Sequence, residues 1–162
     1  MHQTRRNILK GLLAGACVAC LGGRAMAAET FEIVKSDAEW KRILSPAAYD
    51  VMRHEGTEPP GSSALLNEHR KGTFACAGCS LPLYSSDTKF DSGTGWPSFW
   101  QPLPKAIATK VDNSDPFDSR TEVHCRRCGG HLGHVFNDGP KPTGLRYCMD
   151  GVALKFIPAA KS

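Results

Sequence analysis

The sequence predicts a mainly β domain of antiparallel strands with two short helices leading into it. Residues 28–70 carry two helix-start signals, whereas from Gly72 onward short apolar runs alternate with Gly, Pro, Asp and Asn, as strands and turns do. The 162 residues are enough for one domain with a core. Apolar residues at 41% and charged residues at 22% are ordinary for a globular protein and argue against disorder or a coiled coil.

The two helices are expected from the residues that begin them. Ser36 followed by Glu39 forms a capping-box pattern, and in Ser45-Pro46 a serine cap precedes a proline at the first helical position. Residues 57–62, Thr-Glu-Pro-Pro-Gly-Ser, end the second helix and form a linker. Strands are expected over residues 73–75, 121–124, 132–136 and 145–156.

Residues 1–27 have the three-part layout of an export signal. A basic start precedes an apolar stretch over residues 8–23, and Ala25-Met26-Ala27 forms a small-x-small cleavage pattern. Thr4-Arg5-Arg6-Asn7-Ile8-Leu9-Lys10 resembles a twin-arginine signal, which implies the twin-arginine translocase as a partner and the periplasm as the destination. The sequence therefore predicts a signal peptide over residues 1–27 and one mature domain over residues 28–162.

Two other interpretations of this segment are weaker. Only 13 uncharged residues separate Lys10 from Arg24, fewer than the roughly 20 that a bilayer-spanning helix needs. Cys17 and Cys20 lack the leucine three positions upstream that a lipoprotein signal usually carries. The basic residues of this segment also account for the net charge of +4, so the remainder has no excess of positive charge and nucleic acid is not expected as a partner.

Two pairs of cysteines predict one zinc site. Each pair has the C-x2-C spacing that lets neighbouring thiolates reach one ion, and glycines within or after each pair allow tight turns. Four thiolates leave no position open for water, so the ion is expected to be structural. Two disulfides, or a thioredoxin-like redox pair, are the alternative interpretations. The predicted ligands are Cys76, Cys79, Cys125 and Cys128.

A fifth cysteine, Cys148, is a candidate nucleophile. On a strand, Arg146, Cys148 and Asp150 share one face, and a cation beside a thiol favours the reactive thiolate. The alternative is a buried cysteine that acts as a small apolar residue. His131 and His134 are three residues apart and would face opposite ways on a regular strand, so the glycine between them must bend the chain if both serve one site.

A Gly-rich aromatic segment over residues 92–100 contains Trp96 and Phe99 and is suited to wall a small apolar pocket. Taken with the cysteines and histidines, it makes the chain resemble the B-type methionine sulfoxide reductases, one of two enzyme types that each reduce one epimer of methionine sulfoxide. The resemblance runs from about Trp40 to Phe156. Its motifs are both cysteine pairs and residues 56–60 (GTEPP), 89–93 (KFDSG), 95–99 (GWPSF), 131–136 (HLGHVF), 138–140 (DGP) and 144–148 (GLRYC).

The resemblance implies two twisted antiparallel sheets, with zinc on the side away from the substrate, and a catalytic domain over residues 28–162. It implies that Cys148 attacks the sulfoxide sulfur and becomes a sulfenic acid, while His134, assisted by His131, supplies the proton that the oxygen gains. Trp96 and Phe99 would bind the substrate, and Arg146 would hold the thiolate. Oxidised proteins would be the substrates, and a thioredoxin-like or other thiol the reductant.

Two residues depart from the family pattern. Thr94 stands where many members carry a second, resolving cysteine, so we expect a one-cysteine cycle completed by an outside thiol. Asp150 stands where the family usually has asparagine. An ionised Asp150 would raise the pKa of Cys148, whereas a protonated one could donate to the substrate oxygen, and the sequence leaves both open. A zinc-stabilised binding module without turnover is the rival function.

Overall fold

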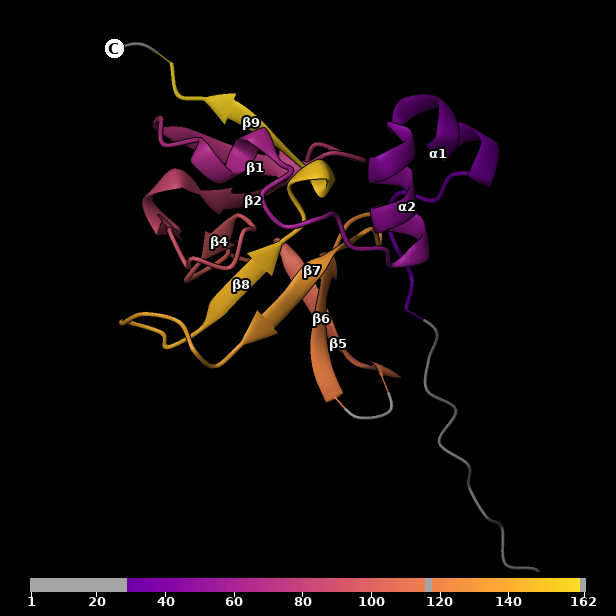
Figure 1. The fold of residues 1–162 in the computed structure, drawn as a ribbon. Helices are drawn as coiled ribbons and strands as arrows, with labels where there is room; N and C mark the ends of the chain where they lie inside the picture. Colours follow the sequence, from indigo (N-terminus) through magenta and orange to yellow (C-terminus); the bar gives the residue numbers. More distant parts are fainter. Residues whose placement is uncertain (1–28, 116–117, 161–162) are drawn as a thin grey trace, which may run out of the picture.

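The computed structural model describes residues 29–115 and 118–160, which begin with the two predicted helices (Figure 1). α1 spans Asp37–Ile43 and α2 spans Pro46–His54. The Ser36 side chain accepts from the N–H of Glu39, and the Glu39 carboxylate accepts from the N–H of Ser36 at 2.8 Å. Ser45 caps α2 in the same way. Both helices are therefore confirmed, whereas the predicted signal peptide lies outside the described residues.

The strands form two antiparallel sheets, as expected. In Figure 1 the smaller sheet, with the order β2-β1-β9, lies above the larger one, with the order β3-β4-β8-β7-β6-β5. The strand bounds are β1 Gly72–Cys76, β2 Pro82–Ser85, β3 Lys89–Phe90, β4 Ser98–Phe99, β5 Ile107–Asp115, β6 Asp118–Cys125, β7 His131–Phe136, β8 Arg146–Met149 and β9 Leu154–Pro158.

The single strand expected over residues 145–156 is wrong. The chain leaves β8 after Met149, makes a 3-10 turn, η3, over Gly151–Ala153, and continues as β9 in the other sheet. Gly151 is buried at this turn, and a side chain there would collide with the hydroxyl of Ser63. Close packing against a distant segment therefore sets the break, and Asp150 lies at the corner rather than on the strand.

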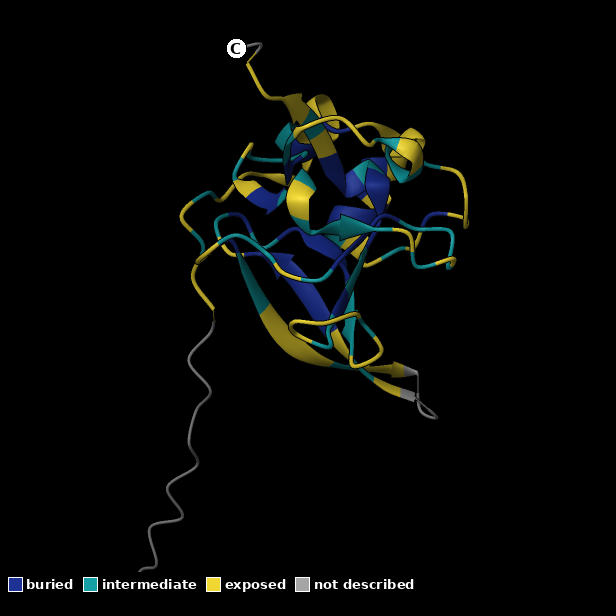
Figure 2. Ribbon diagram, turned by 90° about the vertical axis from the view of Figure 1, so that its left-hand side faces the viewer, coloured by how far each residue is buried: buried dark blue, intermediate teal, exposed yellow. Residues whose placement is uncertain are grey.

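The core fills the space between the two sheets. Figure 2 shows buried residues gathered inside the domain, with exposed residues along the outer strands and turns. Phe74 on β1 and Tyr84 on β2 pack against Phe99 on β4, and the Tyr84 hydroxyl donates to the sulfur of Met149 on β8 at 3.1 Å. Burial of apolar surface stabilises the folded state by about 25 cal/mol per Å2, and these contacts hold β8 in place between its neighbouring strands.

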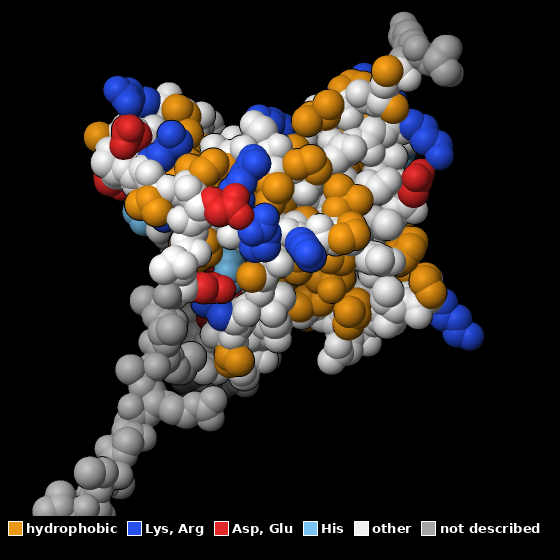
Figure 3. Space-filling view, turned by 180° about the vertical axis from the view of Figure 1, so that it is seen from behind, with side chains coloured by type: hydrophobic (Ala, Val, Ile, Leu, Met, Phe, Trp, Pro, Cys, Tyr) orange, Lys and Arg blue, Asp and Glu red, His pale blue; other side chains and the backbone are white. Residues whose placement is uncertain are grey.

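The surface carries both signs of charge. In the face seen in Figure 3, Lys and Arg side chains lie among Asp, Glu and apolar side chains rather than in one continuous basic field. Among the described residues, no helix has the length and apolar character needed to cross a membrane.

Candidate active site

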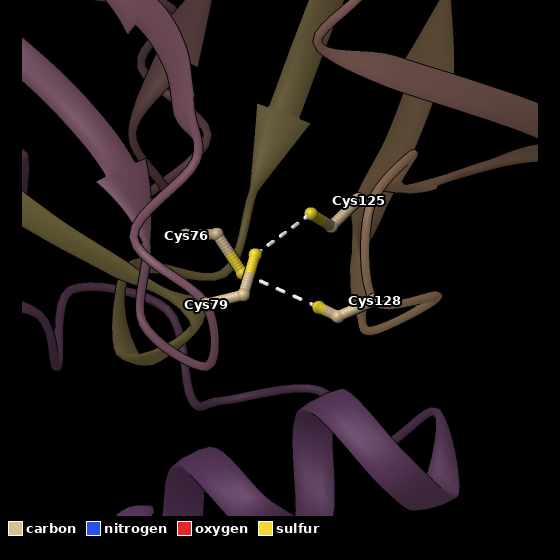
Figure 4. Close-up of side chains that lie close together, drawn as sticks. All are labelled: Cys76, Cys79, Cys125 and Cys128. Atoms are coloured by element: carbon tan, nitrogen blue, oxygen red, sulfur yellow. Dashed lines mark hydrogen bonds between the residues drawn. The ribbon is translucent and has the colours of Figure 1, made fainter. Parts of the chain in front are cut away.

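Four cysteine sulfurs converge at one end of the two sheets. Cys76 ends β1 and Cys125 ends β6, and the tight turn that follows each strand brings in the second cysteine of the pair (Figure 4). All four sulfurs lie within 4.8 Å of one another, close to the spacing of about 3.8 Å that a tetrahedron with bonds of about 2.3 Å requires. The cluster consists of Cys76, Cys79, Cys125 and Cys128, and it could hold a zinc ion.

The alternatives to a metal site fit this geometry less well. All five cysteines of the described residues are free, and the sulfurs of Cys76 and Cys128 are 3.7 Å apart, well beyond a disulfide bond of about 2.05 Å. The helices cover the cluster: α2 places Met52 against Gly130, and Trp40 of α1 lies against Gly78. The N-terminal helices therefore shield the cysteines from solvent, a role that sequence reasoning missed.

A separate cavity of about 140 Å3 opens beside β8. It brings together four of the predicted site residues, Cys148, His134, Asp150 and Trp96. None of the four clustered cysteines is among its lining residues, which are Thr57, Trp96, Arg120, Gly133, His134, Phe136, Cys148 and Asp150. The described residues thus contain a metal-type cluster and a distinct cavity that contains a free thiol.

Cys148 sits at the centre of this cavity because of strand register. On β8 it pairs with Ser98 of β4 on one side and with His134 of β7 on the other. The aromatic segment and the histidine segment, far apart in sequence, therefore meet at the thiol. Burial raises the pKa of Cys148, while the hydroxyl of Thr94 and the charge of Arg146 oppose that rise.

A β-bulge allows both histidines to approach the site. Val123 and His124 of β6 pair with Gly133 and His131, so one extra residue bends β7 between the histidines. Gly133 has a φ of +142°, and a side chain there would collide with the carbonyl oxygen of Cys148. The rings of His131 and His134 lie 5.3 Å apart, which confirms the predicted bend at this glycine.

Each histidine has a carboxylate partner that sequence reasoning missed. His134 Nε2 lies 2.8 Å from Asp112 Oδ2 on β5, and His131 Nδ1 lies 2.9 Å from Glu122 Oε1 on β6. Burial lowers the pKa of both histidines, and for His134 the hydrogen bond to Asp112 opposes that change. His131 is 2% exposed and does not line the cavity, but its ring lies beside His134 and it interacts electrostatically with Asp150.

Arg146 is held firmly at the start of β8. Its Nε and Nη2 atoms each lie 2.8 Å from a carboxylate oxygen of Asp138, and its guanidinium stacks 4.3 Å from the ring of Phe136. The hydrogen bonds to Asp138 raise the pKa of Arg146, so the guanidinium stays charged. Its positive charge lowers the pKa of Cys148, and Phe136, on which it stacks, lines the cavity and was missed by sequence reasoning.

Asp150 is a buried carboxyl in contact with the linker. It is 4% exposed, and its Oδ1 accepts from the N–H of Glu58 at 2.8 Å. Burial raises the pKa of Asp150 from 3.8 to about 6. The Glu58 carboxylate accepts from the N–H of Gly151 at 2.6 Å, and the Glu58 carbonyl accepts from Trp96 Nε1 at 3.0 Å. One linker residue therefore anchors both Asp150 and Trp96.

Phe99 does not lie where a substrate contact was expected. It is fully buried, its ring stacks on Tyr84 at 4.3 Å, and it is absent from the residues that line the cavity. Because successive residues of a strand point to opposite faces, Phe99 turns into the core while Ser98 turns toward the site. The apolar wall opposite Trp96 is supplied by Phe136 instead.

Comparison with known proteins places the chain in a family. The SelR domain model matches residues 44–158. Three similar proteins carry the name peptide methionine sulfoxide reductase MsrB. Those of Leptospira interrogans and Bradyrhizobium diazoefficiens are each 52% identical to this chain, over 78% of it and 96% and 91% of their own lengths. That of Methanosarcina barkeri is 50% identical over 76% of this chain and 87% of its own. The chain belongs to the SelR-domain family, the B-type methionine sulfoxide reductases.

Proposed function

We propose that this chain reduces methionine (R)-sulfoxide in proteins through a one-cysteine cycle at Cys148. Its family makes it an oxidoreductase of the methionine sulfoxide reductase type. The observation that supports the mechanism is the position of Cys148. Among the described residues it is the one cysteine outside the four-cysteine cluster, and it lines a cavity with a histidine and two aromatic rings.

The first half-reaction transfers one oxygen atom. The Cys148 thiolate attacks the sulfoxide sulfur and forms a transient S–S bond. The protonated oxygen then moves to the Cys148 sulfur as the S–O bond of the substrate and the S–S bond break, so methionine leaves and Cys148 becomes a sulfenic acid. The oxygen gains a proton as it is transferred, and His134, the strand partner of Cys148 on β7, supplies it as general acid. Trp96 and Phe136 form an apolar seat for the methyl group, and the charge of Arg146 favours the thiolate.

The second half-reaction needs an external reductant. An outside thiol attacks the Cys148 sulfenic acid and releases water, and a second thiol then resolves the mixed disulfide to regenerate the Cys148 thiol. Thr94, whose Oγ1 lies 3.8 Å from the Cys148 sulfur, holds the position nearest to Cys148 in the aromatic segment and offers no thiol. The net reaction consumes two thiols and yields methionine, water and one disulfide. A thioredoxin-like protein is a suitable source of those thiols.

The four clustered cysteines would hold zinc, which when bound supplies a cross-link between the turns after β1 and β6. Because four thiolates fill a tetrahedral site, the ion takes no part in the reaction. Metal analysis of the purified chain checks this directly. One zinc per chain, lost in the Cys128→Ser variant together with a lower melting temperature, is the expected result, and a metal-free folded chain would refute it.

We also propose export by the twin-arginine translocase, with residues 1–27 as the signal and the periplasm as the destination. The support is the sequence pattern of residues 4–10 and the cleavage pattern at Ala25-Met26-Ala27. Fractionation of cells that produce the full chain and its Arg5→Lys, Arg6→Lys variant tests this. Periplasmic enzyme that is lost in the variant supports the proposal, and unchanged export contradicts it.

The test of the function uses each epimer of a methionine sulfoxide peptide with dithiothreitol as reductant. Reduction of the R epimer alone, abolished in Cys148→Ser, is the expected result. After a single turnover without reductant, mass spectrometry should find one added oxygen on Cys148, whereas an intramolecular disulfide to Cys148 would contradict the one-cysteine cycle. Binding of the R epimer by a folded chain without turnover would favour a binding module instead.

A further inference from the structure

Three hydroxyl groups form a continuous chain that ends at the Cys148 sulfur. Ser98 Oγ lies 2.7 Å from Ser92 Oγ, Ser92 Oγ lies 2.8 Å from Thr94 Oγ1, and Thr94 Oγ1 lies 3.8 Å from Cys148 Sγ. At the far end, the Ser98 hydroxyl is 3.2 Å from the carbonyl oxygen of Trp96, which can only accept. Ser98 is fully buried directly opposite Cys148 in the β4–β8 pairing, whereas Ser92 and Thr94 are partly buried, so the chain runs from the interior toward the surface.

The hydrogen bonds of this hydroxyl chain can run in either of two directions. Each hydroxyl has one proton and can donate one hydrogen bond along the chain. With Cys148 as a thiol, the sulfur donates to Thr94, Thr94 to Ser92, Ser92 to Ser98, and Ser98 to the Trp96 carbonyl, so every donor has an acceptor. With Cys148 as a thiolate the order reverses, because Thr94 must donate to the sulfur and can then no longer donate to Ser92.

The Thr94 hydroxyl is a stronger donor to the sulfur when another group donates to its own oxygen. Ser92 can donate this hydrogen bond to the Thr94 oxygen, because its hydroxyl can turn toward Thr94 when the Ser98 hydroxyl donates a hydrogen bond to Ser92. Hydrogen bonds aligned in this way polarise one another, and a donor is worth most when its acceptor is charged. Ser92 therefore stabilises the thiolate without touching the sulfur, whereas the Ser98 hydroxyl also lowers the pKa of Cys148 by a hydrogen bond of its own.

We propose that Ser92 is a positioning residue that turns the hydroxyl proton of Thr94 toward Cys148 and so stabilises its thiolate. The proposal rests on Cys148 being the nucleophile of the proposed function. The charged and titratable groups around the thiol are Arg146 at the start of β8, Asp150 after its end, His134 on β7 and Arg120 on β6, and all four stay unchanged in the variants below.

The pH dependence of Cys148 alkylation tests the proposal without requiring turnover. The full chain, loaded with zinc, is treated with iodoacetamide between pH 6 and 10.5, and the peptide that contains Cys148 is quantified by mass spectrometry. In Ser92→Ala we expect the rate at pH 7 to fall about tenfold, because a hydrogen bond to a charged group is lost or weakened, while the rate at the high-pH plateau stays unchanged. Ser92→Thr, which keeps the hydroxyl, should restore the wild-type curve.

A double-mutant cycle shows whether Ser92 acts through Thr94. If it does, Ser92→Ala has no further effect in a Thr94→Val background, whereas independent effects that add would overturn this route. Ser119→Ala removes an exposed hydroxyl as a control and should leave the curve unchanged. A Ser92→Ala curve that superimposes on the wild type overturns the proposal. Failure of the proposed function appears separately, as sulfoxide reduction that survives in Cys148→Ser.

Discussion

The buried carboxyl of Asp150 makes the stability of this protein depend on pH. Burial raises the pKa of Asp150 from 3.8 to about 6, so the folded state holds the proton more tightly than the unfolded chain does. Folding stability from this group is complete below the unfolded pKa and is lost as the pH rises through the folded pKa. The difference between the two pKa values corresponds to a loss of about 3 kcal/mol at pH 8.

Replacing Asp150 by asparagine removes this titration and keeps the local contacts. The amide oxygen can still accept from the N–H of Glu58, as the carboxylate does at 2.8 Å. Of the total of about 3 kcal/mol, about 1.4 kcal/mol falls between pH 5 and pH 8. We therefore expect the free energy of unfolding of Asp150→Asn, relative to the wild type, to be higher at pH 8 than at pH 5 by about 1.4 kcal/mol.

Urea unfolding in zinc-containing buffer at the two pH values measures this quantity. Asp91→Asn, an exposed carboxyl whose Oδ1 accepts from the N–H of Gly93, is the matched control. An Asp150→Asn difference that is the same at pH 5 and pH 8 would refute the reasoning. The same variant also removes a negative charge that raises the pKa of Cys148, so its alkylation at neutral pH should be faster.

Three further predictions concern residues around the cavity. Phe99→Ala should lower the free energy of unfolding by about 3–5 kcal/mol because Phe99 is a core residue, whereas Trp96→Ala should chiefly raise KM. A Phe99→Ala variant that is as stable as the wild type but has a raised KM would contradict the placement of Phe99 in the core. Glu58→Ala leaves two backbone N–H groups without their carboxylate acceptor, so it should lower the free energy of unfolding by about 1–3 kcal/mol for each; an unchanged free energy of unfolding would contradict this role. If His134 is the general acid, the rate of sulfoxide reduction falls as the pH rises through the pKa of His134. Asp112→Asn should move that fall to lower pH, because the Asp112 carboxylate raises the pKa of His134. A pH–rate profile of the variant identical to that of the wild type would exclude a catalytic role for the His134–Asp112 pair.

Short-range patterns in the sequence were enough for several features. The capping box at Ser36 and Glu39 and the cap at Ser45 depend on contacts three residues apart, so they could be predicted from the chain alone. The need for a bend at Gly133 followed from the period of a strand, and the bulge confirms it. Local geometry is set by neighbouring residues, and the sequence contains those neighbours in order.

Other features depend on which distant segments meet. Strand periodicity could not show that the run over residues 145–156 breaks at Gly151, because the break comes from packing against Ser63. It also could not show that Phe99 faces the core while Phe136 lines the cavity. A strand has two faces, and the sequence does not say which of them the rest of the protein covers.

By itself, the sequence determined the cysteine spacing, the helix caps, the candidate nucleophile Cys148 and the motifs of the family. Only the tertiary structure decided the partners of those groups: Asp112 for His134, Glu58 for Asp150 and Trp96, and the hydroxyl chain that ends at Cys148. The physical reason is that folding brings together residues that lie between 22 and 92 positions apart along the chain. Burial then changes their pKa values in ways that no local pattern records.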